Sequence, residues 1–252
     1  MARGRTTFGR LARRLGTALL LAPVVSLVAF AFGQPHAARS HLLAFAPLAA
    51  LTDFEPIGRG RFVDPDWDGK TVGDFERMLA EAQGRVEGFF GSPLRSRPTV
   101  IAADSPQRIQ RYMTNFHGST HTTAVATIVV LGPKGRASVD VIAHELAHAE
   151  HAARAGWLRY ALSPMWFIEG LGMQVDYRKN YADRAWAERT VNGASAPTLE
   201  TLASGRGFAQ GDLTANYAHA RREVARWLSA AEPGDLAELL ETWRFEQRYR
   251  AQ

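Results

Sequence analysis

Residues 141–148 read VIAHELAH, which contains the spacing H-E-x-x-H within a helix predicted over 138–155. Side chains four residues apart lie on one face of an α-helix, so the imidazoles of His144 and His148 can bind the same cation. Imidazole nitrogen suits Zn²⁺, and a catalytic zinc site leaves one tetrahedral position for water. Glu145 stands beside the first histidine, where it can take a proton from that water as a general base.

A second motif supplies a candidate third ligand. Residues 164–172 read PMWFIEGLG, and the intervening residues allow the first helix to end near Gly156 and a second helix to return antiparallel. Glu169 can then reach the metal from the opposite side, which two ligands on one helix cannot do. Trp166 and Phe167 would pack in the core and seat this helix. The alternative is that Glu169 is a surface carboxylate and that the histidines are solvated.

Other third ligands fail on geometry. His151 lies on the same helix face as His144, but about 10 Å further along the axis, too far for one tetrahedral ion. The metzincin pattern, another zinc-binding motif, would need a histidine at position 154, where this chain has Arg154.

HELAH followed by WFIEG at this separation resembles the gluzincin zinc peptidases, the superfamily that includes the thermolysin-like enzymes. The matching stretch covers about 138–178. The resemblance implies that His144, His148 and Glu169 bind Zn²⁺ and that Glu145 is the catalytic base. It also implies that the strand before the metal helix, predicted over 124–131, lines the cleft and pairs with an extended peptide. An interior strand without a free edge is the alternative.

Hydrolysis places negative charge on the former carbonyl oxygen, and a hydrogen-bond donor besides the metal usually stabilises it. Tyr217 is the candidate, because similar enzymes often place a tyrosine on a late helix. His219 is the rival, and Tyr217 also fits an apolar packing stripe. His117 and His121 are expected to be solvated residues of a loop.

The sequence differs from the thermolysin-like enzymes at a residue that supports a zinc ligand. Those enzymes have an aspartate four residues after the glutamate ligand, where this chain has Met173. The sequence assigns the role of orienting a zinc histidine neither to Asp140 nor to Asp176.

The order of predicted elements indicates an α+β fold with an N-terminal mixed or antiparallel sheet and a helical C-terminal half. We expect a loop-rich linker over 39–70 and a metallopeptidase domain over 71–252. The predicted strands are 98–103 and 124–131, with short strands in 52–69. The predicted helices are 72–90, 105–113, 138–155, 164–178, 182–190, 213–230 and 235–250.

The leader, residues 1–38, carries five arginines and no acidic residue, and 15–33 is almost wholly apolar. This pattern predicts an uncleaved signal anchor or, alternatively, a cleaved signal peptide; in both cases the rest of the chain is exported. A second apolar patch at 41–51 is too short to span a bilayer.

Composition excludes several classes of protein. The chain has 30 basic and 25 acidic side chains, so without the leader the charges balance at 25 each, and nucleic acid is not expected as a partner. No cysteine is present, which excludes a disulfide scaffold, a thiolate metal site and a cysteine nucleophile.

The sequence therefore predicts an exported, membrane-tethered zinc metalloprotease that hydrolyses peptide bonds by Glu145-assisted attack of zinc-bound water. Its partners would be a peptide or protein substrate and the membrane. Two alternatives stay open: a non-catalytic zinc-containing envelope binding module, and a zinc amidase that acts on a non-peptide cell-wall amide. An intramembrane protease is excluded, because Asp140, Glu150 and Arg154 flank the motif.

Overall fold

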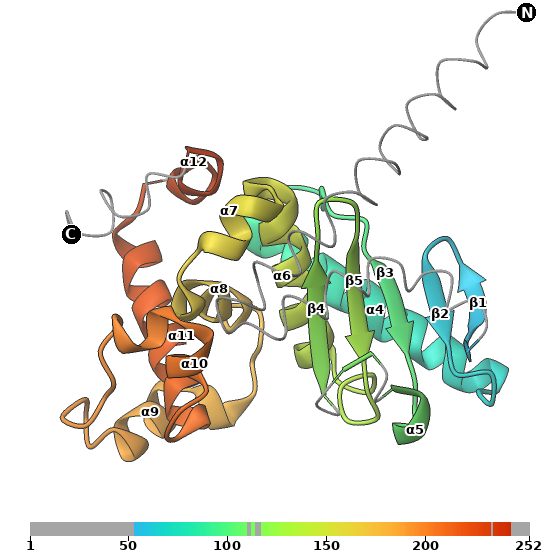
Figure 1. Cartoon of the computed structure of the whole chain (residues 1–252), viewed down its shortest axis with the longest axis horizontal. Helices are drawn as coiled ribbons and strands as arrows, with labels where there is room; N and C mark the ends of the chain where they lie inside the picture. Colours follow the sequence, from blue (N-terminus) through green and yellow to red (C-terminus); the bar gives the residue numbers. More distant parts are fainter. Residues whose placement is uncertain (1–52, 110–111, 114–116, 233, 243–252) are drawn as a thin grey trace, which may run out of the picture.

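The computed structural model describes residues 53–109, 112–113, 117–232 and 234–242. Its sheet has five strands in the order β1-β2-β3-β5-β4 (Figure 1). β2, β3 and β5 run parallel, while β1 and β4 pair antiparallel at the two ends. The predicted α+β fold with a mixed sheet is confirmed. The strands are β1 (Glu55–Gly58), β2 (Arg61–Val63), β3 (Thr99–Ala102), β4 (Gly118–Thr122) and β5 (Thr127–Leu131).

The two central strands are buried on both faces. Successive side chains of a strand point to opposite faces, so Val100 and Val129 pack on one side of the sheet and Ile101 and Ile128 on the other. The first side is covered by α4 (Gly69–Phe90) and α6 (Val139–Ala155), which also pack against each other. The second side includes Ile109 of the short helix α5 (Pro106–Ile109).

The ends of α4 and α6 follow from local sequence. Asp68 begins α4 by accepting a hydrogen bond from the Thr71 N–H at 2.7 Å, and Gly91 ends it in a left-handed conformation. The Ser138 hydroxyl accepts from the Val141 N–H at the start of α6. These capped helices place the H-E-x-x-H motif on a buried helix against the sheet.

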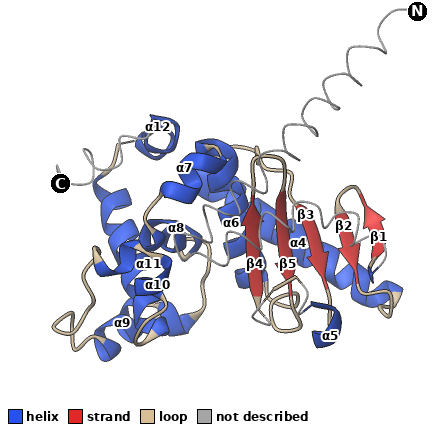
Figure 2. Cartoon of the chain, in the orientation of Figure 1, coloured by secondary structure: helices blue, strands red, loops and turns tan. Residues whose placement is uncertain are grey.

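The C-terminal half is helical. Figure 2 shows the strands in one half of the molecule and these helices in the other, with α6 between them. Besides the two apolar clusters on the faces of the sheet, a third one packs the C-terminal helices together and includes Phe167, Leu171, Val224 and Trp227. The helices are α7 (Trp157–Leu162), α8 (Met165–Gly172), α9 (Asp183–Arg189), α10 (Gly205–Phe208), α11 (Leu213–Ala230) and α12 (Asp235–Thr242), with two 3-10 turns, η1 (Lys179–Tyr181) and η2 (Thr201–Ala203).

The strand predicted over 124–131 is present as β5, which begins at Thr127. It lies between β3 and β4, so the interior alternative is confirmed and the expectation that this strand pairs with an extended peptide is wrong. The segment expected to be a loop around His121 contains β4, the last described strand on this side of the sheet. Its sequence, GSTHT, lacks an apolar run because a short strand at the end of a sheet needs little burial.

Some predicted helices differ in length. The helix predicted over 164–178 ends at Gly172, and the helix predicted over 105–113 is reduced to α5. The helix α7 was not predicted. The leader, the apolar patch at 41–51 and residues 243–250 lie outside the described residues.

Within the described part of the chain, no helix is both long enough and apolar enough to cross a membrane.

Candidate metal centre

The face of α6 that carries His144 and His148 forms as the spacing predicts. His144 and His148 are buried, and their ring centroids lie 4.6 Å apart. The two Nε2 atoms are separated by 2.9 Å, so both imidazoles present the same nitrogen to one point. One turn of helix is enough to create this pair.

Glu169 of α8 completes the group. Its Oε2 atom lies 3.2 Å from Nε2 of His144 and 3.5 Å from Nε2 of His148. The three donor atoms come from two helices that are in contact, and the described part of the chain can hold a metal ion here. The structure thus brings together the three side chains that the two sequence motifs singled out.

Two glycines allow α8 to carry Glu169 to this place. A Cβ atom on Gly172 would lie 2.9 Å from Cε1 of His144, so only glycine lets the helix pass this close to the imidazole. A Cβ atom on Gly170 would lie 2.5 Å from Val224 Cγ2 and 2.6 Å from the Ala220 carbonyl oxygen of α11. Gly170 and Gly172, which follow Glu169 in α8, therefore fix the distance of this helix from both of its neighbours.

The charges of the centre favour a cation. Burial opposes ionisation of Glu169, but the charge of His148 and hydrogen bonds from His144 and His148 outweigh it and lower its pKa. Glu145 is buried nearby, and among the described residues neither glutamate has an ion pair with lysine or arginine. A divalent cation held by Glu169 and the two histidines would balance the negative charge of Glu169 and of the buried Glu145.

Asp176 lies behind His144, a role that the sequence left unassigned. Its Oδ2 atom is 3.7 Å from Nδ1 of His144, and its side chain is completely buried. Arg178 holds the carboxylate through several hydrogen bonds, including one from Nε at 2.9 Å. Asp140, the other acid considered, instead pairs with Arg85 at 2.5 Å. Asp176, rather than Asp140, is thus the aspartate that lies next to Nδ1 of His144, at a distance longer than a hydrogen bond.

Glu145 is held by the last described strand of the sheet. The Thr120 hydroxyl of β4 lies 2.7 Å from Glu145 Oε2 and 2.9 Å from the Glu145 carbonyl oxygen. Gly118 of the same strand passes so close that a Cβ atom there would lie 2.7 Å from Oε1 of Glu145. Sequence reasoning missed Thr120, because the segment 117–123 was expected to be a loop.

Tyr217, rather than His219, lies at the centre. The Tyr217 ring centroid is 6.1 Å from that of His144, and the negative charge of Glu169 followed by burial raises the pKa of this phenol well above 10. The phenol therefore stays protonated and can donate a hydrogen bond. His219 instead stacks on Trp186 and accepts its indole N–H at 3.1 Å.

Tyr160 of α7 is a second phenol near the carboxylates, and it was not predicted. Burial and then the charges of Glu169 and Glu145 raise its pKa above the ordinary value. One signal in the sequence could have found it. Tyr160 lies on the segment that connects the helix of His144 and His148 to the helix of Glu169. His151 packs against this ring at 5.0 Å and lies outside the ligand group, as its spacing predicted.

No protein-family model, curated protein or solved structure matches this chain.

Proposed function

We propose that this protein is a zinc-dependent metallohydrolase that cleaves peptide bonds. The observation that carries the proposal is the convergence of His144, His148 and Glu169 beside the buried carboxylate of Glu145. A structural site has no need of such a base, whereas a hydrolase does. The resemblance of HELAH and WFIEG to the gluzincin motifs supports the same reaction class.

The donor set suits zinc in particular. With bonds to histidine and carboxylate of the usual length, a tetrahedral zinc ion would keep its ligand atoms about 3.3 Å apart. The separations here are 2.9, 3.2 and 3.5 Å. Two histidines and one glutamate leave a fourth position open. A zinc ion held by these residues would supply Lewis-acid polarisation of water and of the substrate carbonyl.

The remaining side chains have distinct roles in the proposed reaction. Glu145 would accept a proton as water oxygen bonds to the carbonyl carbon, and would return that proton to nitrogen as the C–N bond breaks. Thr120 would keep the carboxylate aimed at the water. Tyr217 and Tyr160 would donate hydrogen bonds to the oxygen on which negative charge develops.

The first experiment measures metal content and turnover in the full-length protein, kept in solution by an amphipathic polymer. We expect about one zinc ion per chain in the wild type and its loss in Glu169→Ala. Glu145→Gln should keep the zinc but lower turnover by about 10²–10⁴-fold, because only the base is removed. Glu188→Gln, an exposed glutamate of α9, is the matched control. Stoichiometric zinc in Glu169→Ala would disprove the ligand assignment.

Substrate class is tested with a mixture of unrelated peptides and with cell-wall fragments, both incubated in ¹⁸O water. Peptide hydrolysis should place one ¹⁸O atom in each new carboxylate, which mass spectrometry detects. Cleavage of the cell-wall fragments alone would select the amidase. Zinc binding without hydrolysis of either, unchanged in Glu145→Gln, would select the non-catalytic binding module.

We also infer from the leader that the proposed hydrolase is exported and tethered to the membrane. Five arginines before an apolar stretch favour retention of the N-terminus in the cytoplasm. The mass of the protein recovered from membranes tests this directly. An intact leader would establish the anchor, and its removal would establish a secreted form.

A further inference from the structure

A cavity of about 460 Å³ lies between α4, α6 and the first residues of β2 and β3. Leu146 of α6 lines it. Two residues advance an α-helix by roughly 200°, so Leu146 points to the side opposite His144. The cavity is therefore separate from the candidate metal centre, and its volume is that of a small-molecule site.

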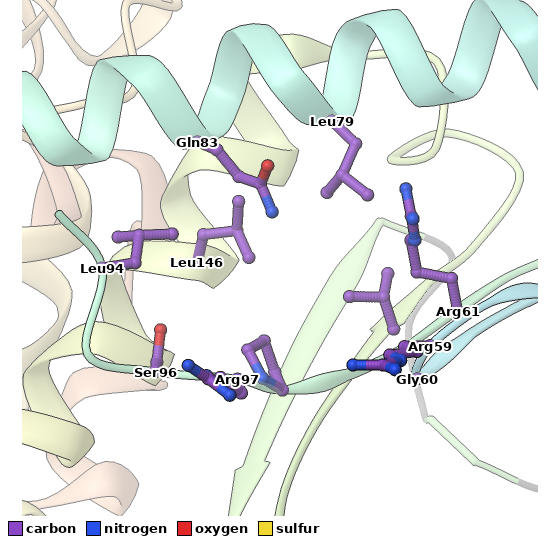
Figure 3. A pocket seen from close by; sticks show the side chains of 11 residues that line it. Arg59, Gly60, Arg61, Leu79, Gln83, Leu94, Ser96, Arg97 and Leu146 are labelled. Carbon is purple, nitrogen blue, oxygen red and sulfur yellow. The ribbon is translucent and has the colours of Figure 1, made fainter.

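One part of the lining is apolar. Leu79 of α4, Val100 of β3 and Leu146 of α6 are nearly completely buried and face the cavity. Figure 3 shows Leu79, Leu146 and the nearby Leu94 on one side of the space. Such a surface favours an apolar group, because burying aliphatic carbon removes it from water.

A buried hydroxyl without a partner lies on the opposite side. Ser96 is 9% exposed, and its Oγ atom has no hydrogen-bond partner among the described residues. Its backbone N–H donates to Glu150 of α6 at 2.9 Å, and Glu150 is in turn held by Arg154 at 2.7 Å. These contacts fix the backbone of Ser96 in the wall of the cavity. Its hydroxyl is buried in that wall, and a change of side-chain rotamer would bring it to an incoming polar group.

The mouth of the cavity is basic. Arg59, Arg61 and Arg97 line it, and Arg61 forms an ion pair with Glu76 at 3.0 Å. Arg59 and Arg97 are exposed and have no acidic partner in the described part of the chain. Figure 3 shows both on the same side of the space as Ser96. Guanidinium groups bind carboxylates and phosphates with two parallel hydrogen bonds.

The turn that carries Arg59 is held in place. Gly60 adopts φ of +71°, a left-handed conformation that favours glycine, and its carbonyl accepts the Val100 N–H at 2.7 Å. Arg59 therefore projects from a fixed turn against β3.

We propose that this cavity is a binding site for a small anion with an apolar tail, such as a medium-chain carboxylate. The anionic head binds Arg59 and Arg97 at the mouth and accepts a hydrogen bond from Ser96. The tail packs against Leu79 and Leu146. This site does not depend on the proposed peptidase activity.

Titration calorimetry on the full-length protein, kept in the amphipathic polymer so that no free detergent competes, tests the proposal. The probes are octanoate, its uncharged counterpart octanol, and inorganic phosphate. We expect one saturable octanoate site, with much weaker binding of octanol and of phosphate. The double variant Arg59→Gln/Arg97→Gln should bind octanoate about tenfold more weakly or worse, because charged hydrogen bonds are lost.

Two further variants complete the design. Ser96→Ala keeps the shape of the wall and should also weaken octanoate binding. Arg184→Gln changes an exposed arginine of α9 and should have no effect. The proposal is overturned if octanoate does not bind, or if it binds equally well to the double variant. It is also overturned if octanol or phosphate binds as tightly as octanoate.

Discussion

α6 and α8 both supply ligands to the candidate metal centre, but they are held in place differently. α6 has 17 residues, a serine cap at its start and almost every side chain buried, and it packs against α4 and the sheet. α8 has eight residues and begins at Met165, after Pro164, without a side-chain cap. Its position depends on close contacts with α6 and α11.

This difference separates a local contribution to the site from a non-local one. His144 and His148 converge through helix periodicity alone, so any stable α6 would present them together. Glu169 reaches them only if α8 keeps its distance from two neighbouring helices. Substitutions that disturb the packing of α8 should therefore lower the metal affinity, although no ligand residue is changed.

The largest expected effect comes from Gly170→Ala. The added methyl group would lie within 2.6 Å of α11 backbone, so α8 must move and Glu169 with it. We expect a loss of about 1–3 kcal/mol in unfolding free energy and weaker metal binding. Denaturant unfolding and chelator competition measure the two.

Gly84→Ala in α4 is the matched control for this change. Nothing lies within 4 Å of a Cβ atom there, so alanine should stabilise the helix by about 0.5–1 kcal/mol and leave the metal affinity unchanged. Equal behaviour of the two variants would show that α8 packing does not position Glu169.

Asp176→Asn should lower zinc affinity by about 10–100-fold, because the amide no longer supports His144 with a negative charge. Chelator competition measures this change. Asp183→Asn, at an exposed aspartate of α9, should bind zinc as the wild type does. An unchanged affinity in Asp176→Asn would exclude Asp176 as the partner of the histidine.

Thr120→Val should lower kcat about tenfold while zinc remains bound, because the variant loses a hydrogen bond to the Glu145 carboxylate. Steady-state kinetics and metal analysis give the two readings. Thr122→Val alters the same strand, where the hydroxyl faces Thr127 instead, and should keep full turnover. If both variants are equally active, β4 does not aim the base.

The smallest effect concerns His219 in the helical half. Burial lowers its pKa below 6.5, so the unfolded chain binds more protons than the folded one as the pH falls below this value. The stability contributed by neutral His219 is therefore complete above pH 6.5 and declines below it. Urea unfolding from pH 8 to pH 5 should show this decline in the wild type. In His219→Gln the part of this decline that comes from His219 should be absent. Identical pH profiles for the two proteins would show that His219 does not cause it.

Much of the secondary structure followed from the sequence. The apolar spacing of α4, the β-branched run of β5 and the periodicity of α11 each predict the element that the structure contains. β4 did not follow, because its polar residues GSTHT carry no alternation and are ordered by pairing with β5. The early end of α8 also escaped prediction, since residues 173–178 fold back towards His144 rather than continue the helix.

The sequence by itself determined the pair His144 and His148, the neighbouring Glu145 and the candidate ligand Glu169, because spacing in a helix and the residue types are local properties. Only the tertiary structure decided that Asp176 lies behind His144, that Thr120 holds Glu145, and that Tyr217 rather than His219 faces the centre. These contacts join residues distant in the chain, and the packing of α6 between the sheet and the C-terminal helices sets them.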